Sequence, residues 1–162
     1  MATAALKVTV LESLKELLVG AGFKKRGTTF WKAVGDTIHL VALQASQSST
    51  SSTVKLTLNL AVSIPALVER GGPHDVWSAH WRERIASLMP NPGDVWWSIS
   101  TAEEAANASK EMLEALSKFG LPAQDRIGSS AELLKVLDSG RSPGLTKVQS
   151  QTYVRQLRSG AA

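Results

Sequence analysis

The sequence contains no cysteine, which excludes disulfides, thiolate nucleophiles, cysteine-containing zinc fingers and cysteine-ligated iron–sulfur clusters. It also lacks any run of roughly 18 consecutive apolar residues, the length that a membrane-spanning helix needs. The N-terminus shows no basic start followed by an apolar stretch, as a secretory signal would. From the last two absences we expect a soluble, cytoplasmic protein that does not associate with membranes.

Motifs that would indicate a known reaction are also absent. The chain has no Gly-x-Ser-x-Gly elbow, no phosphate-binding glycine loop and no dinucleotide fingerprint. Its histidines, His39, His74 and His80, match no metal-ligand spacing. The adjacent acids Glu103 and Glu104 fit the start of a helix, where negative charge is favourable. We therefore expect no cofactor and no metal, and we favour a protein without catalytic activity.

The length and the charge distribution indicate one domain followed by a basic tail. A chain of 162 residues with 43% apolar side chains is long enough for one domain with its own core. The net charge is +4, and the whole excess follows Asp138, in Arg141, Lys147, Arg155 and Arg158. We expect a single α+β domain over residues 1–138. Residues 139–162 then form a basic C-terminal tail, in which a short helix can form at 146–158.

Hydrophobic periodicity predicts a helix first, then strands, then helices. The clearest strand is 54–64, where apolar and more polar residues alternate, so one face is expected to be buried and the other polar or partly covered. Gly120-Leu121-Pro122 is expected to end the long helix that starts after Thr101. The segment 78–88 can be either a strand or a helix. The remaining predicted elements are a helix at 5–19, strands at 28–34, 37–44 and 94–99, and a short helix after Ser129.

This order favours the α+β class. We predict an antiparallel sheet of about five strands, with the N-terminal helix and the C-terminal helices packed on it. The sequence leaves the order of the strands and the oligomeric state open.

Several stretches, taken in order, resemble the bacterial family called domain of unknown function 4304. They are Gly22-Phe23-Lys24-Lys25-Arg26-Gly27-Thr28-Thr29-Phe30-Trp31, the alternating strand that ends at Pro65, His80-Trp81-Arg82-Glu83-Arg84-Ile85, and Asp94-Val95-Trp96-Trp97. The resemblance covers roughly residues 5–138. It implies a compact α+β domain and brings no activity, cofactor or partner with it.

The segment around residue 82 is the first candidate binding site. In a strand, His80, Arg82 and Arg84 share one face, and two arginines with a histidine can hold a phosphate or a carboxylate. The structural alternative is a set of ion pairs with nearby acids such as Glu83 or Asp94. In a helix the same residues regroup, with His80 beside Arg84.

The tryptophans are the second candidate. Neighbours in a strand point to opposite faces, so Trp96 and Trp97 cannot both enter one core layer. Whichever of the two lies on the second face must be covered by a helix or form an exposed aromatic patch that binds a partner. Trp81 is a candidate binding residue together with them. Core packing is the simpler interpretation.

A basic turn, Lys24-Lys25-Arg26, is the third candidate. It can contact nucleic acid, or it can be solvated beside the C-terminal end of the first helix, which is the simpler interpretation.

Three functional hypotheses follow. The first is a non-catalytic binding module for a protein partner, of which antitoxin-like immunity proteins are an example by analogy only. The second is a protein or enzyme that binds a small anionic molecule through His80, Arg82 and Arg84. The third and weakest is nucleic-acid binding through the basic tail.

Overall fold

The computed structural model describes residues 2–67, 75–90, 95–139 and 145–161, and it has the α+β class that the sequence predicts. The strands follow one helix and precede the others. In chain order the elements are α1 (Ala2–Gly20), β1 (Lys24–Arg26), β2 (Thr29–Val34), β3 (Thr37–Ala45), β4 (Val54–Ser63), β5 (Trp81–Arg84), β6 (Trp97–Ile99), α2 (Ala102–Ala115), α3 (Leu121–Asp125), α4 (Ser130–Asp138) and α5 (Lys147–Gln156).

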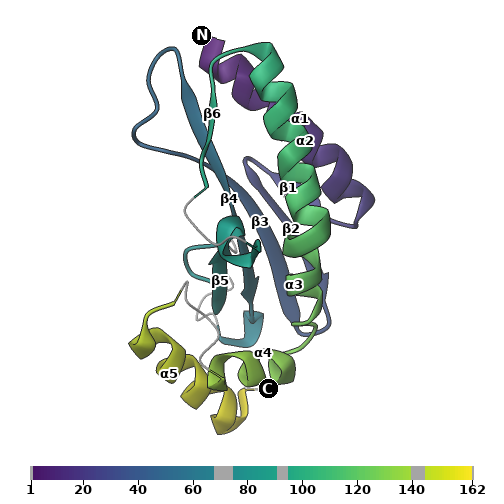
Figure 1. Cartoon of the computed structure of the whole chain (residues 1–162). Helices are drawn as coiled ribbons and strands as arrows, with labels where there is room; N and C mark the ends of the chain where they lie inside the picture. The colour runs from purple at the N-terminus through teal and green to yellow at the C-terminus, as the bar shows by residue number, and fades with distance from the viewer. Residues whose placement is uncertain (1, 68–74, 91–94, 140–144, 162) are drawn as a thin grey trace.

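The strands form one antiparallel sheet of six strands in the order β1-β2-β3-β4-β5, with β6 also paired to β4. The β3–β4 pairing is the longest and runs from Ile38↔Ser63 to Ala45↔Leu56. Helices α1 and α2 lie together on one side of this sheet (Figure 1). We call this side the helix-covered face and the opposite side the second face.

The main core lies between the sheet and the helices. Alternate residues of β4, such as Leu58 and Leu60, point to the helix-covered face and are fully buried, as are Val10 and Leu14 of α1. The apolar residues at every second position of the strand therefore pack in one layer with those at every third or fourth position of the helix.

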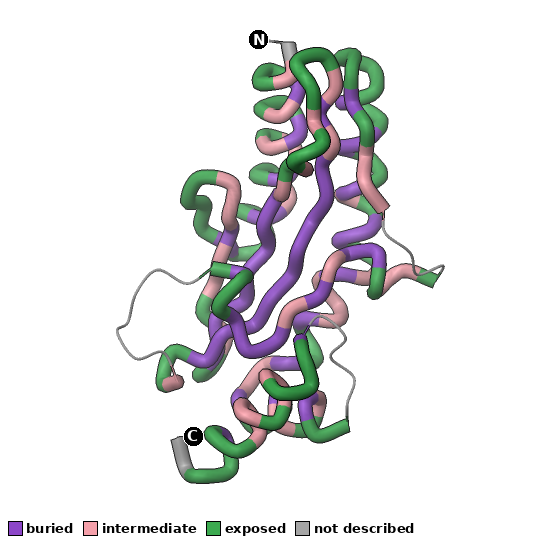
Figure 2. Tube along the Cα trace, turned by 90° about the vertical axis from the view of Figure 1, so that its left-hand side faces the viewer, coloured by how far each residue is buried: buried purple, intermediate pink, exposed green. Residues whose placement is uncertain are grey.

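The second face is more deeply buried than the alternation in β4 predicts. Thr57, Asn59, Ala61 and Ser63 are at most 3% exposed. Part of the cover is a smaller apolar cluster, which joins residues of β3 and β4 to the turn before β5: Ile38, Leu40, Ala42, Ala61, Val76 and Ala79. In Figure 2 the central strands run as long buried stretches, with no helix in front of their middle part.

Helix α1 ends where the glycines predict. Gly22 has a φ of +95°, which glycine adopts at no steric cost, and the Phe23 amide donates to the Leu18 carbonyl oxygen at 2.9 Å. The next three residues differ from the expectation of a turn, because Lys24–Arg26 pairs with β2 as an edge strand.

The prediction that Gly120-Leu121-Pro122 ends the long helix is wrong. A π-helical turn (Leu116–Gly120) follows α2 and leads directly into α3, where Pro122 occupies the first turn and needs no hydrogen-bonded N–H. Gly120 permits close packing on the sheet instead, because a Cβ there would lie 2.9 Å from Leu60 Cδ2.

The structure shows that segments 78–88 and 94–99 each contain a short strand. The segment around residue 82 is a strand at Trp81–Arg84, followed by a 3₁₀ turn at Ile85–Leu88. The predicted strand at 94–99 is shorter, because β6 begins at Trp97, and Asp94 lies outside the described residues.

The C-terminal segment contains the expected helix. Thr146 caps α5, and Leu157 just beyond it is 5% exposed. The domain division at residue 138 and the cytoplasmic location stay predictions. Among the described residues, no helix combines the length and the apolar character needed to cross a bilayer.

Candidate functional site

Strand β5 places the predicted arginines on the second face of the sheet. Its burial alternates, with Trp81 and Glu83 buried and Arg82 and Arg84 half-buried. Trp81 packs in the main core, so the alternate residues Arg82 and Arg84 point the other way. Arg82 lies opposite Ala61 of the neighbouring β4.

Each of these arginines lies against a tryptophan. The guanidinium carbon of Arg82 is 5.3 Å from the ring centroid of Trp77, and that of Arg84 is 5.1 Å from the ring centroid of Trp96. Cations at such distances are attracted by the negative face of the ring. Arg82 Nη1 also donates to the Trp77 carbonyl oxygen at 3.1 Å. We call these four residues the Arg–Trp face.

Trp77 is presented by a tightly bonded turn. One carboxylate oxygen of Asp75 accepts hydrogen bonds from the Trp77 and Ser78 amides, both at 2.9 Å, and from the Ser78 hydroxyl at 3.1 Å. Val76 and Ala79 on either side are buried against the sheet, whereas Trp77 itself is 55% exposed. The indole is therefore held outward by a turn whose neighbouring residues are anchored.

A third cation–aromatic pair lies on the same face of the sheet. Lys24 Nζ is 5.1 Å from the ring centroid of Trp31. Trp31 pairs with Leu40, Leu40 with Ala61, and Ala61 with Arg82, so one row of residues connects this pair to the Arg–Trp face.

His80 does not join the two arginines as a receptor for a small anion. It is 4% exposed, and its Nδ1 accepts a hydrogen bond from the Ile64 amide at 3.0 Å. Its ring packs edge-on against Tyr153 of α5, with 4.8 Å between centroids. The alternation of the sequence predicts that the three side chains share one strand face. His80, however, comes just before β5 and is buried.

The structure separates the other predicted tryptophans. Trp81 is 3% exposed and belongs to the main core. Trp97 packs against that core, and its Nε1 donates to Glu111 of α2 at 2.7 Å. Trp96 precedes β6 and lies with Arg84 on the second face. Sequence reasoning did not select Trp77, although its Asp-Val-Trp-Ser context is a recognisable turn signal.

The basic residues form two separate groups. Lys24, Lys25 and Arg26 are all exposed on β1, while Lys147, Arg155 and Arg158 lie on or just after α5, far from β1 (Figure 1). Arg158 forms an ion pair with Asp138 at 2.7 Å. The two groups therefore do not make one continuous surface for nucleic acid.

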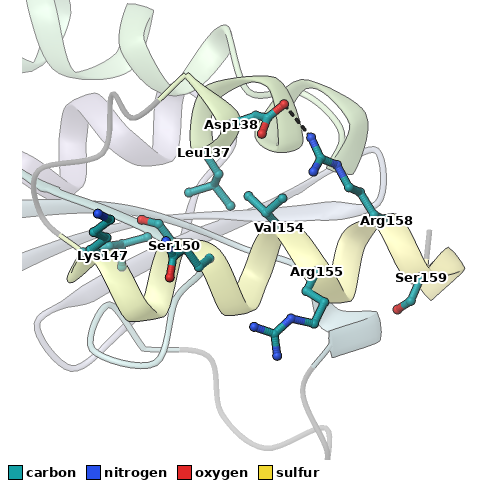
Figure 3. Close-up of a pocket in the computed structure, with 10 residues that line it drawn as sticks. Leu137, Asp138, Lys147, Ser150, Val154, Arg155, Arg158 and Ser159 are labelled. Carbon is teal, nitrogen blue, oxygen red and sulfur yellow. Dashed lines mark hydrogen bonds and ion pairs between the residues drawn. The ribbon is translucent and has the colours of Figure 1, made fainter.

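A cleft of about 1100 Å³ lies between α4 and α5. We call it the α4–α5 cleft. Leu137 and Val154 face each other across it, and Lys147 and Arg158 stand at opposite ends of the helix that lines it (Figure 3). An apolar middle between Lys147 and Arg158, of which Arg158 is already paired with Asp138, suits an elongated amphiphile better than a compact anion.

A buried histidine on the helix-covered face has a structural role. His39 Nε2 donates to the Ile127 carbonyl oxygen at 2.8 Å, and burial lowers the pKa of its imidazole. Among the described residues, which leave out His74, no group of three metal-ligating side chains occurs.

Comparison with known proteins matches residues 14–126 to a family model described as Domain of unknown function (DUF4304). No curated protein and no solved structure matches the chain.

Proposed function

We propose that this chain, which belongs to the family of domain of unknown function 4304, is a non-catalytic interaction module. Its Arg–Trp face binds an acidic segment of a partner protein. The observation that carries this proposal is the pair of arginines on one face of β5, each of which lies over a tryptophan ring.

The residue types fit a protein interface. Tryptophan and arginine are the residues that most often dominate the binding energy of protein interfaces. Trp77 is 55% exposed, yet its turn is fastened by Asp75 and by the buried residue Val76. An anchored aromatic side chain loses little conformational freedom when it binds, so more of its contact energy appears as affinity.

The charge fits an acidic partner. The guanidinium group of arginine carries five N–H donors in one plane. Those in-plane donors match the two oxygens of a carboxylate. Lys24 on Trp31 extends the same combination of cation and ring along the sheet.

Affinity capture of the tagged full-length protein from a lysate of its source organism tests the proposal. We expect one near-stoichiometric protein, lost in the double variant Arg82→Ala/Arg84→Ala and in Trp77→Ala. The matched control is Lys25→Ala/Arg26→Ala, which removes the same charge from exposed β1. Capture that survives the Arg82→Ala/Arg84→Ala change, or that fails equally in the control, would contradict the proposal.

A second candidate function is binding of a small anionic amphiphile in the α4–α5 cleft. It is favoured by the cleft's volume of about 1100 Å³ and by Leu137 and Val154 between the cations. Ligands that bind only the folded state raise the melting temperature, so a panel of alkyl carboxylates and alkyl phosphates tests it. A stabilising compound should lose its effect in Val154→Asp and keep it in Val148→Asp, because Val148 is 72% exposed on the same helix.

A further inference from the structure

Helix α1 carries apolar side chains on its outer side as well as on its core side. Val8 is 55% exposed and Val19 is 49% exposed, and both belong to the small set of exposed large apolar side chains among the described residues. Their side of the helix lies opposite the buried stripe of Leu6, Val10 and Leu14. The outer side of α1 therefore combines two exposed valines with the charged residues Glu12 and Lys15 between them.

The exposed positions form a regular stripe. Val8, Glu12, Lys15 and Val19 follow one another at steps of four, three and four residues. At about 100° per residue these positions fall within an arc of about 60°. This is the spacing at which one helix packs along another in a coiled coil. All four are exposed, and they line a shallow hollow formed by α1 residues alone.

The order of residues in this stripe is complementary to itself. The midpoint of the stripe lies between Ser13 and Leu14. Val8 and Val19 are equally far from this midpoint, and so are Glu12 and Lys15. A second α1 placed antiparallel across a two-fold axis therefore sets Val8 against Val19 and Glu12 against Lys15, each twice. Isologous contacts of a two-fold dimer require this kind of self-complementary patch.

The neighbouring positions also fit close contact. Continuing the stripe toward the N-terminus gives Ala5, which is small and exposed. Glu12 and Lys15 form no ion pair with any residue that the structure describes. Their charges are thus available for a contact between chains.

We propose that two copies of this chain associate through antiparallel α1 helices, with Val8 packed on Val19 and Glu12 paired with Lys15 of the other copy. One helix from each copy buries less than the roughly 1,600 Å² of a standard stable interface, so the dimer is reversible and depends on concentration. This surface is distinct from the Arg–Trp face, and its test does not depend on the proposed function.

Sedimentation velocity of the full-length protein over a range of concentrations measures the association directly. We expect the wild type to dimerise, and Glu12→Lys and Lys15→Glu each to weaken the dimer at least about tenfold by placing like charges opposite each other. The double variant Glu12→Lys/Lys15→Glu should dimerise again, because the swap restores complementarity.

Mixing the single variants gives the sharpest outcome. Glu12→Lys supplies two cations and Lys15→Glu supplies two anions, so the mixture should form a heterodimer although neither variant forms a homodimer. Val8→Ser should also weaken association, whereas Val148→Ser, a control at another exposed valine, should not. A monomeric wild type, or single variants that dimerise unchanged, would overturn the proposal. Circular dichroism melting curves check that each variant is folded.

Discussion

The imidazole of His39 donates a hydrogen bond from Nε2 to the backbone oxygen of Ile127, 2.8 Å away, and links β3 to the segment between α3 and α4. Its other ring nitrogen, Nδ1, is buried without a hydrogen-bond partner. A proton at Nδ1 would therefore place a charge in the interior with nothing to receive it.

The free energy of unfolding should decrease as the pH falls below about 6.5. Burial lowers the pKa of His39 from its ordinary value of 6.5, so the unfolded chain takes up this proton first. Above that range the contribution of His39 is constant. Urea unfolding between about pH 8 and about pH 5 measures the effect. His39→Gln should show a smaller decrease over this range, and an equal decrease in both proteins would assign it to other groups.

Gly35→Ala should destabilise the protein by about 2–4 kcal/mol. Gly35 has a φ of +57°, and a Cβ there would lie 2.8 Å from the Gly128 carbonyl oxygen. Gly20→Ala is the matched control, since no atom lies within 4 Å of a Cβ at Gly20. Denaturant midpoints compare the two. Equal effects would mean that the turn at Gly35 relaxes.

Loss of the side chain should destabilise the protein strongly at Trp81 and very little at Trp77. Trp81→Ala should cost about 3–5 kcal/mol, because the side chain belongs to the main core. Trp77→Ala should change stability by less than about 0.5 kcal/mol, because the indole is largely exposed. Thermal and urea unfolding of both variants test this. A large loss in Trp77→Ala would give that residue a structural role and weaken the proposed interface.

Thr101→Ala should cost about 1 kcal/mol. The Thr101 hydroxyl accepts a hydrogen bond from the Glu104 amide at 3.1 Å, and Glu104 Oε2 accepts from the Thr101 and Ser100 amides. Thr152→Ala, inside α5, should be neutral or stabilising, because alanine has the higher helix propensity. If the two threonine variants lose equal stability, the cap is not what holds the start of α2.

Local patterns predicted most of the secondary structure. The alternation at residues 54–64, the glycines after α1, and the capping pair Thr101 and Glu104 each depend on chain neighbours, and each is found at or within a few residues of its predicted place. The prediction failed at Gly120 because its cause is not local. That glycine accommodates Leu60 of β4, and nothing in its own neighbourhood shows this contact.

The candidate site divides in the same way. The sequence by itself determined that Arg82 and Arg84 share a strand face and that Trp96 and Trp97 point apart, because side chains alternate along any extended chain. Only the tertiary structure decided that Trp77 lies on Arg82, that His80 is buried against Tyr153, and that both faces of β4 are covered. These contacts join segments that are distant in sequence, and their partners are selected by packing of the whole chain, which no local period encodes.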